Sequence, residues 1–370
     1  MAEIRVKNLH KTFGDFVAVK DSSFTVKNGD FFCLLGPSGC GKTTTLRVIA
    51  GLELPTSGQI FLGDEDVTFK RASHRDIAFV FQLFALYPHM NVRKNIAFPL
   101  LSQGMPRAQI EAKVQEAARV LRIQHLLDKP VSGLSSGDRQ RVALGRAIVR
   151  NPLAFMMDEP LGALDSEFRE LMCQELRGLH DRLQATTVYV THDQLEAMSM
   201  ADTIAIMNQG VIEQLGAPQD IYERPVSVFV ADFIGSPAMN FLPFEGAFAA
   251  GTTQVPLGAA QMGIPALREH VPASPLLYGV RPEHVRFDDH SALRAEVLGS
   301  EYLGTCQIVT LAAAQGGTLR AKVGVQGAAK RGDQVGLAFD TDAVSVFDRA
   351  SGRALATARD ERPAAGARHG

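Results

Sequence analysis

A strongly apolar run, residues 30–35, leads directly into a glycine-rich segment, residues 36–43, and this arrangement constrains the fold more than any other feature. A nearly continuous apolar run of this length is typical of a strand that is buried on both faces of a parallel sheet. Three further runs have the same character and are followed by polar residues: 77–81, 153–157 and 187–190. Segments with helical spacing separate them, so the sequence predicts an α/β domain with its ligand site at the carboxyl ends of the strands.

The glycine-rich segment fits the phosphate-binding pattern known as the P-loop, because it joins a strand to the start of a helix. Its glycines allow backbone N–H groups to surround phosphate oxygens, and the helix dipole adds its positive end. Lys42 would place a point charge at the β and γ phosphates, and Thr43 would supply a hydroxyl ligand for Mg²⁺. The alternative is a glycine-rich turn that binds no nucleotide. The residues predicted to contact nucleotide here are Gly36, Pro37, Ser38, Gly39, Cys40, Gly41, Lys42, Thr43 and Thr44.

Two acidic residues, Asp158 and Glu159, follow the third apolar run. At the end of such a strand, Asp158 can hold Mg²⁺ while Glu159 polarises the attacking water. An isolated Asp-Glu pair would more often belong to an exposed loop or to a helix cap. The prediction of a catalytic role therefore depends on the P-loop in the same chain.

The length of 370 residues predicts two domains, because single cores rarely grow beyond about 250–300 residues. A formal net charge of −2 provides no basic excess of the kind that attracts nucleic acid or anionic lipid, so we expect no nucleic-acid partner. The four cysteines lack CxxC spacing, which favours a reducing cytosol over a zinc site or a disulfide framework. Cys40 is interpreted as a small side chain that fills its loop rather than as a redox-active thiolate. No run of about 18 apolar residues occurs, so we expect other subunits to form any membrane pore.

The sequence changes character after about Gly235. Gly, Ala and Pro are frequent between residues 246 and 275, and the remaining apolar runs are short and separated by turn residues. This pattern predicts a first domain over residues 1–235 and a small all-β domain over residues 236–357. Residues 358–370 are rich in Arg, Ala, Gly and Pro, and we expect them to be a disordered tail.

Residues 134–142 read L-S-S-G-D-R-Q-R-V and resemble the signature motif of ABC ATPases. The other motifs of that family follow in the expected order: Phe13 before the P-loop, Gln82 after a strand, an Asp-loop at residues 161–165, and His192 after a further strand. The resemblance implies a P-loop NTPase domain of the ABC type. It also implies an inserted helical subdomain at about residues 86–150 and an OB-like regulatory domain at the C-terminal end.

The resemblance gives each matching residue an expected role. Phe13 would stack on adenine, although a role in packing a turn is the alternative. Gln82 would contact Mg²⁺ and the attacking water, Glu159 would be the general base, and His192 would brace it against the γ-phosphate. The signature residues Ser135 and Gly137 would contact the ATP held by a second protomer, so that two chains enclose two ATP molecules. The implied catalytic set is Glu159, His192, Gln82 and Lys42, and the implied metal-binding set is Thr43, Gln82 and Asp158.

Three positions depart from the commonest form of the family's motifs. Ser136 stands where Gly is usual, Asp138 where Gln is usual, and Gly162 where the Asp-loop usually has Ser. In the first turn of a helix, Asp138 suits the macrodipole, but the same carboxylate beside a bound triphosphate would weaken nucleotide affinity. Gly162 has no side-chain hydroxyl, so whether one hydrogen bond between the protomers forms is left open.

Residues 81–90, F-Q-L-F-A-L-Y-P-H-M, resemble the permease-facing segment of importer ATPases, and residues 107–127 resemble their helical subdomain. The alternative is that Phe84, Leu86 and Tyr87 are core residues. Residues 232–242 and 279–284 resemble the carbohydrate-uptake branch, which includes maltose and glycerol-phosphate importers.

Membership of that branch would make the chain the ATP-hydrolysing subunit of an importer for a sugar, polyol or polyol phosphate. Its expected partners are a second copy or another ABC ATPase, two transmembrane permease subunits, and a periplasmic or extracellular solute-binding protein. Its expected place is the cytoplasmic face of the inner membrane. Polyamine, iron and phosphonate importers are alternatives, as is a soluble ABC ATPase without a transport role. A P-loop kinase is disfavoured because a kinase needs no signature motif.

Overall fold

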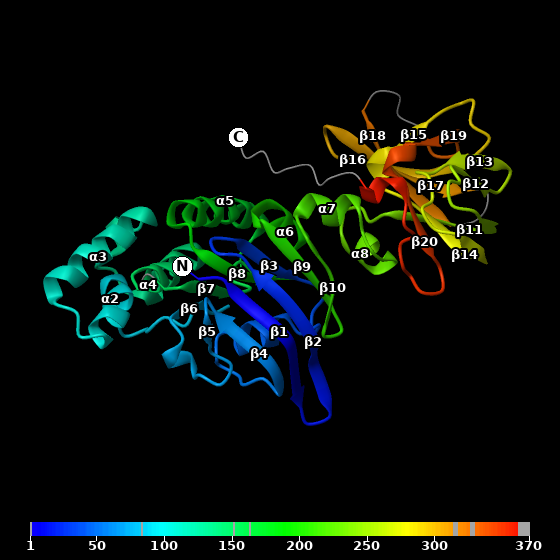
Figure 1. Ribbon diagram of the computed structural model, residues 1–370. Helices are drawn as coiled ribbons and strands as arrows, with labels where there is room; N and C mark the ends of the chain where they lie inside the picture. Colours follow the sequence, from blue (N-terminus) through cyan, green and yellow to red (C-terminus); the bar gives the residue numbers. More distant parts are fainter. Residues whose placement is uncertain are drawn as a thin grey trace. The chain divides into compact units, whose positions relative to one another are not determined.

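The structure is a computed structural model that describes residues 2–82, 84–150, 152–162, 164–313, 317–325 and 330–361. It divides into two compact units, Met1–Pro218 and Gln219–Gly370. The first unit contains two sheets and most of the helices, and the second is built mainly of strands (Figure 1). The predicted succession of an α/β domain and an all-β domain is confirmed.

The central sheet of the first unit has the strand order β10-β9-β3-β8-β7-β6. Its strands are β3 (Phe31–Leu35), β6 (Ile77–Val80), β7 (Ala154–Asp158), β8 (Thr186–Thr191), β9 (Thr203–Asn208) and β10 (Val211–Gly216). All pairings are parallel except that of β9 with β10. The four predicted apolar runs correspond to β3, β6, β7 and β8. Their carboxyl ends meet at one edge of the sheet, where the polar residues that follow them are brought together.

An antiparallel sheet of order β2-β1-β4-β5 lies in the same unit. It contains β1 (Ile4–Phe13), β2 (Phe16–Val26), β4 (Ser57–Leu62) and β5 (Glu65–Asp66). One hydrophobic cluster joins it to the central sheet, and within this cluster the rings of Phe24 and Phe32 stack with centroids 5.2 Å apart. The two sheets therefore share a core.

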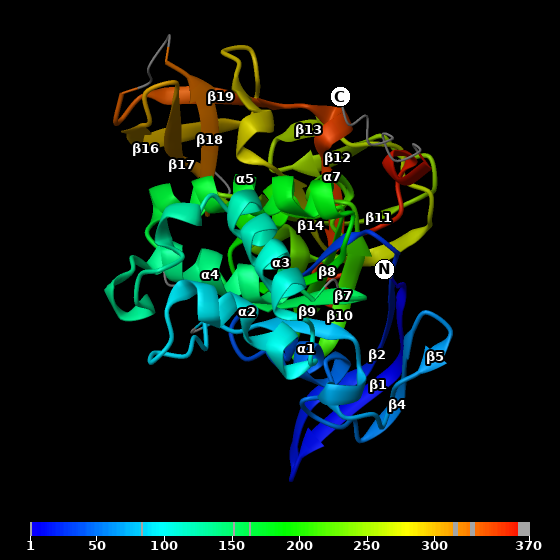
Figure 2. The same cartoon turned by 90° about the vertical axis from the view of Figure 1, so that its left-hand side faces the viewer.

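Helix α1 (Lys42–Ile49) follows β3, and the other helices of the first unit are α2 (Val92–Ser102), α3 (Arg107–Val120), α4 (Ser136–Ile148), α5 (Ser166–Leu183) and α6 (Gln194–Met200). Figures 1 and 2 show α2 and α3 beside α4, at the position expected for the helical subdomain. Gly145 of α4 permits this approach, because a Cβ there would lie 3.1 Å from the Ile96 side chain and 3.2 Å from that of Leu121. Among the described residues, no helix is long and apolar enough to cross a membrane.

The second unit begins with two short helices, α7 (Pro218–Glu223) and α8 (Val228–Phe233). The two compact units meet between Pro218 and Gln219, whereas the domain boundary predicted from composition is at Gly235. The buried guanidinium of Arg281 explains the difference, since it donates hydrogen bonds to the carbonyl oxygens of Tyr222 and Ile234. These bonds attach the segment of α7 and α8 to the all-β unit, although the helical sequence pattern of this segment is like that of the first unit.

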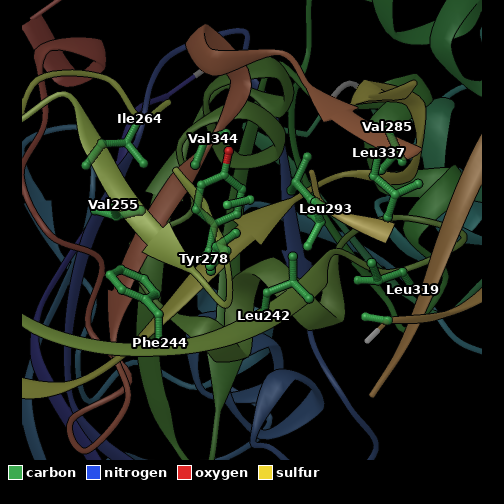
Figure 3. Packing of buried hydrophobic residues seen from close by; sticks show 14 of the residues in the cluster. Leu242, Phe244, Val255, Ile264, Tyr278, Val285, Leu293, Leu319, Leu337 and Val344 are labelled. Atoms are coloured by element: carbon green, nitrogen blue, oxygen red, sulfur yellow. The ribbon is translucent and has the colours of Figure 1, made fainter. Parts of the chain in front are cut away.

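The strands of the second unit form three sheets, of orders β11-β14-β20, β12-β13 and β15-β19-β16-β17-β18. The strands are β11 (Asn240–Phe248), β12 (Gln254–Leu257), β13 (Ala260–Gly263), β14 (Val271–Val280), β15 (Val285–Phe287), β16 (Arg294–Tyr302), β17 (Cys306–Ala313), β18 (Thr318–Gly324), β19 (Gln334–Phe339) and β20 (Ser345–Asp348). Figure 3 shows their shared apolar core, in which Tyr278 packs among aliphatic side chains and donates a hydrogen bond to the Gly263 carbonyl.

Short 3₁₀ turns complete the two units: η1 (Ala72–His74), η2 (Gln124–Leu126), η3 (Val131–Gly133), η4 (Pro282–His284), η5 (Thr341–Ala343) and η6 (Ala358–Glu361). The predicted disordered tail began at Ala358, but residues 358–361 are ordered as η6. The remainder of that tail, residues 362–370, lies outside the described residues.

Candidate nucleotide-binding site

The P-loop connects β3 to α1 and is shaped by close backbone approaches. A Cβ on Gly36 would lie 2.2 Å from the Met207 carbonyl oxygen, and one on Gly41 would lie 2.4 Å from the Ala18 carbonyl oxygen. Gly41 also has φ 108°, which disfavours any residue with a side chain. These contacts fix the path of the loop between β9 and β2, so the glycines are required by packing as well as by the predicted phosphate contacts.

Lys42 opens α1, and its side chain turns back under the loop. The ammonium donates hydrogen bonds to the carbonyl oxygens of Gly36 at 2.8 Å and Pro37 at 2.9 Å, and the side chain is almost fully buried. Nearby Cys40 is a buried free thiol whose pKa is raised by burial, which favours the interpretation of Cys40 as a filler of the loop. The positive charge is thus held at the centre of the loop, where phosphate oxygens are predicted to bind.

Thr43 and Asp158 join the P-loop helix to the end of β7. The Thr43 hydroxyl donates a hydrogen bond of 2.8 Å to Asp158 Oδ1. Burial raises the pKa of Asp158, and the Thr43 hydrogen bond acts in the opposite direction. A hydroxyl and a carboxylate at this distance offer the oxygen ligands that Mg²⁺ prefers, so the two residues fit the predicted metal site.

Glu159 and His192 follow the neighbouring strands β7 and β8. His192 Nδ1 lies 3.3 Å from Glu159 Oε2. The Glu159 backbone has φ 43°, a conformation that is uncommon for a residue with a side chain. It is held there by two hydrogen bonds: its N–H donates to the Val190 carbonyl at 3.0 Å, and its carbonyl accepts from the Gly162 N–H at 3.2 Å. This strained turn places the carboxylate beside the His192 imidazole.

Gln82 follows β6 and its side chain is exposed. Gly162 links it to Glu159, because a Cβ on Gly162 would be 3.9 Å from both the Gln82 amide nitrogen and the Glu159 Cβ. The ends of β3, β6, β7 and β8 therefore gather Lys42, Thr43, Asp158, Glu159, His192 and Gln82, as the sequence predicted. The other loop residues, Ser38, Gly39 and Thr44, lie in the same P-loop and first turn of α1.

Phe13 ends β1 in the antiparallel sheet and is 45 % exposed. The Lys11 ammonium lies 4.5 Å from the centroid of its ring. Lys11 is itself fixed by a hydrogen bond to the Leu54 carbonyl oxygen. An exposed ring with a cation over it suits stacking on a nucleobase better than packing in a turn, so adenine stacking remains the preferred prediction for Phe13.

Ser135 and Gly137 begin α4 within the helical subdomain. Ser135 is the N-cap: its hydroxyl oxygen accepts from the Asp138 N–H at 3.1 Å. Gly137 packs against α5, since a Cβ there would lie 2.3 Å from the Phe168 ring. The hydrogen bonds of the Ser135 hydroxyl are made to Asp138 in its own helix turn, and its contact with a partner's nucleotide stays a prediction.

Comparisons with known proteins agree along the chain. Residues 19–162 match the ABC transporter family, residues 235–285 match the MalK OB fold domain, and residues 278–347 match the TOBE domain. The trehalose/maltose import ATP-binding protein MalK of Thermococcus litoralis is 44 % identical over 96 % of this chain and 100 % of its own length. The chain belongs to the ATP-binding proteins of ABC transporters. It is an ATPase subunit coupled to solute import, as these relatives are.

Other members of the ABC transporter family show the same relationship. The trehalose import ATP-binding protein SugC of Mycobacterium tuberculosis is 44 % identical over 96 % of this chain and 98 % of its own length. An sn-glycerol-3-phosphate import ATP-binding protein of Rhizobium etli is 49 % identical over 74 % of this chain and 80 % of its own. Among solved structures, a dimeric bacterial ABC transporter cassette superimposes with a TM-score of 0.53, 30 % identity, and coverage of 58 % of this chain and 98 % of that one.

Two residues that support the ABC site were missed by sequence reasoning. Arg169 of α5 donates to Asp193 at 2.9 Å, directly after His192. Glu196 of α6 is buried, and its carboxylate accepts hydrogen bonds from the hydroxyls of Tyr189 at 2.8 Å and Thr191 at 2.7 Å. Burial raises the pKa of Glu196. Both residues fix the turn that carries His192, but neither belongs to a short motif, so no local signal could have found them.

Proposed function

We propose that this chain drives import of a sugar, a polyol or a polyol phosphate by hydrolysing ATP between two copies of itself. The observation that carries the hydrolytic part is the Glu159–His192 pair at the end of the parallel sheet, beside Lys42 and the Thr43–Asp158 pair. A carboxylate held by a strained backbone and paired with an imidazole is suited to act as a general base.

The solute class is supported by the relatives and by the second unit. The relatives cited above are named as import proteins for trehalose, maltose and sn-glycerol-3-phosphate. The similarity to the trehalose and maltose import proteins covers 96 % of this chain, and residues 235–285 of the β-rich unit match the MalK OB fold domain. Sugars and polyol phosphates are therefore the preferred solutes for this chain as well.

In the proposed reaction, water attacks the γ-phosphorus of ATP and transfers its proton to the Glu159 carboxylate. The bond between the γ-phosphorus and the β–γ bridging oxygen breaks, and the electron pair leaves with ADP. Lys42 stabilises the charge on the β and γ oxygens. His192 orients Glu159 through the 3.3 Å contact, and Gln82 positions the water from the end of the neighbouring strand β6.

A magnesium ion would be held by Thr43, Asp158 and Gln82, whose side chains offer a hydroxyl, a carboxylate and an amide oxygen. When bound, Mg²⁺ supplies positive charge that neutralises the β and γ phosphates. The chain contributes the oxygen ligands, and Asp158 is the group among them whose charge depends on pH.

The proposed assembly is a homodimer of ATPase subunits docked on two permease subunits at the cytoplasmic face of the inner membrane. A periplasmic or extracellular binding protein would deliver the solute. The exposed N-terminus of α4, with Ser135 as its cap, supports the dimer, because it presents helix-terminal N–H groups that can bind a partner's γ-phosphate. ATP-driven closure of the dimer would then change the state of the permeases.

Reconstitution tests this function. The full chain is assembled with its permeases and binding protein in vesicles, and ATPase activity is measured with trehalose, maltose, glycerol 3-phosphate, a polyamine and a phosphonate in turn. We expect stimulation by a member of the sugar or polyol group and none in the matched E159Q assembly. Stimulation by the polyamine or the phosphonate alone would reject the solute class, and no stimulation by any solute would reject the importer function.

A further inference from the structure

The backbone of residues 84–87 adopts an unusual conformation next to the proposed catalytic Gln82. Phe84 has φ 60° and Ala85 has φ 45°, so two consecutive residues with side chains lie in the left-handed region. A residue with a side chain persists in this conformation only where surrounding contacts impose it. Phe84 is buried, which identifies it as one of the core residues considered as an alternative, whereas Ala85 is exposed.

A single side chain holds this turn. Arg146 of α4 donates from Nη1 to the Ala85 carbonyl at 2.7 Å and from Nη2 to the Phe84 carbonyl at 3.0 Å. Its guanidinium carbon also lies 5.4 Å from the centroid of the Tyr87 ring. The charge of Arg146 is thus directed at these carbonyl dipoles and at the ring. The planar fork of arginine can satisfy two adjacent carbonyls at once, which a lysine cannot.

A second polar side chain attaches the following residues to the same group of helices. The buried Asn95 of α2 accepts from the Tyr87 N–H at 2.9 Å and donates to the carbonyl oxygens of Tyr87 and Met90, each at 3.2 Å. Because α2 packs on α4 at Gly145, the two anchors belong to one packed body. The segment from Phe84 to Met90 is therefore fixed to the helical subdomain, while Gln82 follows β6 of the central sheet.

Arg146 lies on the same helix as the signature residues. Helix α4 begins directly after Ser135, and Arg146 is about 15 Å further along the helix axis, given a rise of 1.5 Å per residue. A helix of this length moves as a rigid element. A displacement of Ser135 toward a partner's nucleotide would therefore carry Arg146 and the two carbonyls that it holds.

We propose that Arg146 is a positioning residue that couples the signature end of α4 to residues 84–90, so that ATP bound at Ser135 of one protomer moves the proposed permease-facing segment of that same protomer. The proposal rests on the proposed function, since it uses the trans contact of Ser135 and the docking role of residues 84–90. In this proposal the Arg146 guanidinium transmits the movement of α4, which ATP binding causes, to the segment on which the permease docks.

Amide hydrogen exchange tests this coupling without any permease. Full-length E159Q, E159Q/R146M and E159Q/R150M are compared with and without Mg-ATP. Arg150 is the control, because it lies just beyond the C-terminal end of α4 and is directed at Asp76 and the Ile77 carbonyl rather than at Phe84. We expect ATP to slow the exchange of residues 84–91 by at least about fivefold in E159Q and E159Q/R150M, and by less than twofold in E159Q/R146M. Residues 36–45 should be protected by ATP in all three.

An equal response of residues 84–91 in E159Q/R146M, or no response in E159Q itself, would overturn the proposal. A milder variant, R146K, covers the case in which R146M fails to fold, and it should give an intermediate response. In the reconstituted transporter, R146M should keep the ATPase rate of the isolated chain within about twofold and lose most of the stimulation by solute. Equal stimulation of R146M and wild type would again contradict the coupling, whereas a wild type without stimulation would contradict the importer function instead.

Discussion

Thr43 Oγ1 donates a hydrogen bond of 2.8 Å to Asp158 Oδ1, which joins the first turn of the P-loop helix to the end of a strand more than a hundred residues later. This contact places the side-chain oxygens of the two predicted metal ligands close enough together to bind one metal ion. It also makes the protonation of Asp158 part of the energetics of the folded chain.

Replacing Asp158 should stabilise the folded chain but weaken its binding of Mg²⁺ with ATP. Burial holds the folded-state pKa above the ordinary value of 3.8. The ionised carboxylate therefore costs stability at every pH above the folded-state pKa, and the cost is absent below 3.8. We expect D158N, without nucleotide, to have a higher Tm than wild type at pH 7 and an unchanged Tm near pH 3. Its affinity for Mg²⁺ with ATP should fall by about 10–100-fold.

The variant T43V provides the opposite change. It removes the hydrogen bond that stabilises the ionised Asp158, so its Tm at pH 7 should fall below that of wild type, while Mg-ATP binding also weakens. Differential scanning calorimetry and nucleotide titration measure both quantities. Parallel Tm changes in D158N and T43V would show that burial of the carboxylate is not what sets stability here.

Replacing the proposed general base should stop turnover but leave binding intact. E159Q keeps the side-chain shape and the backbone turn at φ 43°. Loss of a general base commonly costs about 10²–10⁴-fold in rate, so steady-state ATPase should fall by that factor and an ATP-bound dimer should accumulate. Size-exclusion chromatography with ATP measures the dimer. A rate above about half of the wild-type value would remove Glu159 from the catalytic role.

Lys42 should act already at the binding step. Its ammonium donates to the loop's own carbonyl oxygens and to no carboxylate of the described residues, so it is available to phosphate. A hydrogen bond to a charged group is worth about 1.5–3 kcal/mol, so K42M should weaken Mg-ATP binding by about 10–100-fold. The control is R47M on the same helix, where an exposed arginine pairs with Glu53 and no change in affinity is expected. Unchanged binding by K42M would contradict the P-loop assignment.

The sequence predicted the parts of the site that lie next to their own strands. The P-loop and the Asp158–Glu159 pair are encoded within a few residues of an apolar run, so chain order alone brings them to one edge of the sheet. The contacts that support them are different. Arg146 reaches Phe84 across 62 positions and Arg169 reaches Asp193 across 24, and such side-chain contacts leave no local periodicity or motif.

The second compact unit begins before the change in composition at Gly235 for a related reason. Residues 218–233 have the helical texture of the first unit, and only the composition after Gly235 signals strands. Arg281, which lies 59 residues after Tyr222, is what binds this segment to the β-rich unit. A boundary that depends on one buried long-range contact cannot be located from composition.

The unusual signature residue Asp138 should control how readily ATP closes the dimer. In the single chain, the Ser135 hydroxyl donates its hydrogen to Asp138 Oδ2 at 2.8 Å. That hydrogen is the one that a partner's γ-phosphate would need, and the carboxylate would stand beside the phosphate. Arg141 neutralises the negative charge of Asp138 only in part, because its guanidinium lies 3.8 Å from the Asp138 carboxylate and also pairs with Glu175.

We therefore expect D138N to lower the ATP concentration for half-maximal hydrolysis by about 3–10-fold, since a like charge at a partly exposed site costs on the order of 1 kcal/mol. The asparagine oxygen can still accept from Ser135, so the turn should keep its shape. The control S136G restores the commoner signature residue without changing charge and should shift the ATP dependence by less than twofold. ATP titrations at low and high salt measure the effect, which should shrink as salt screens the repulsion. A higher ATP requirement in D138N would mean that the carboxylate supports Ser135 as part of the helix cap rather than opposing the partner's nucleotide.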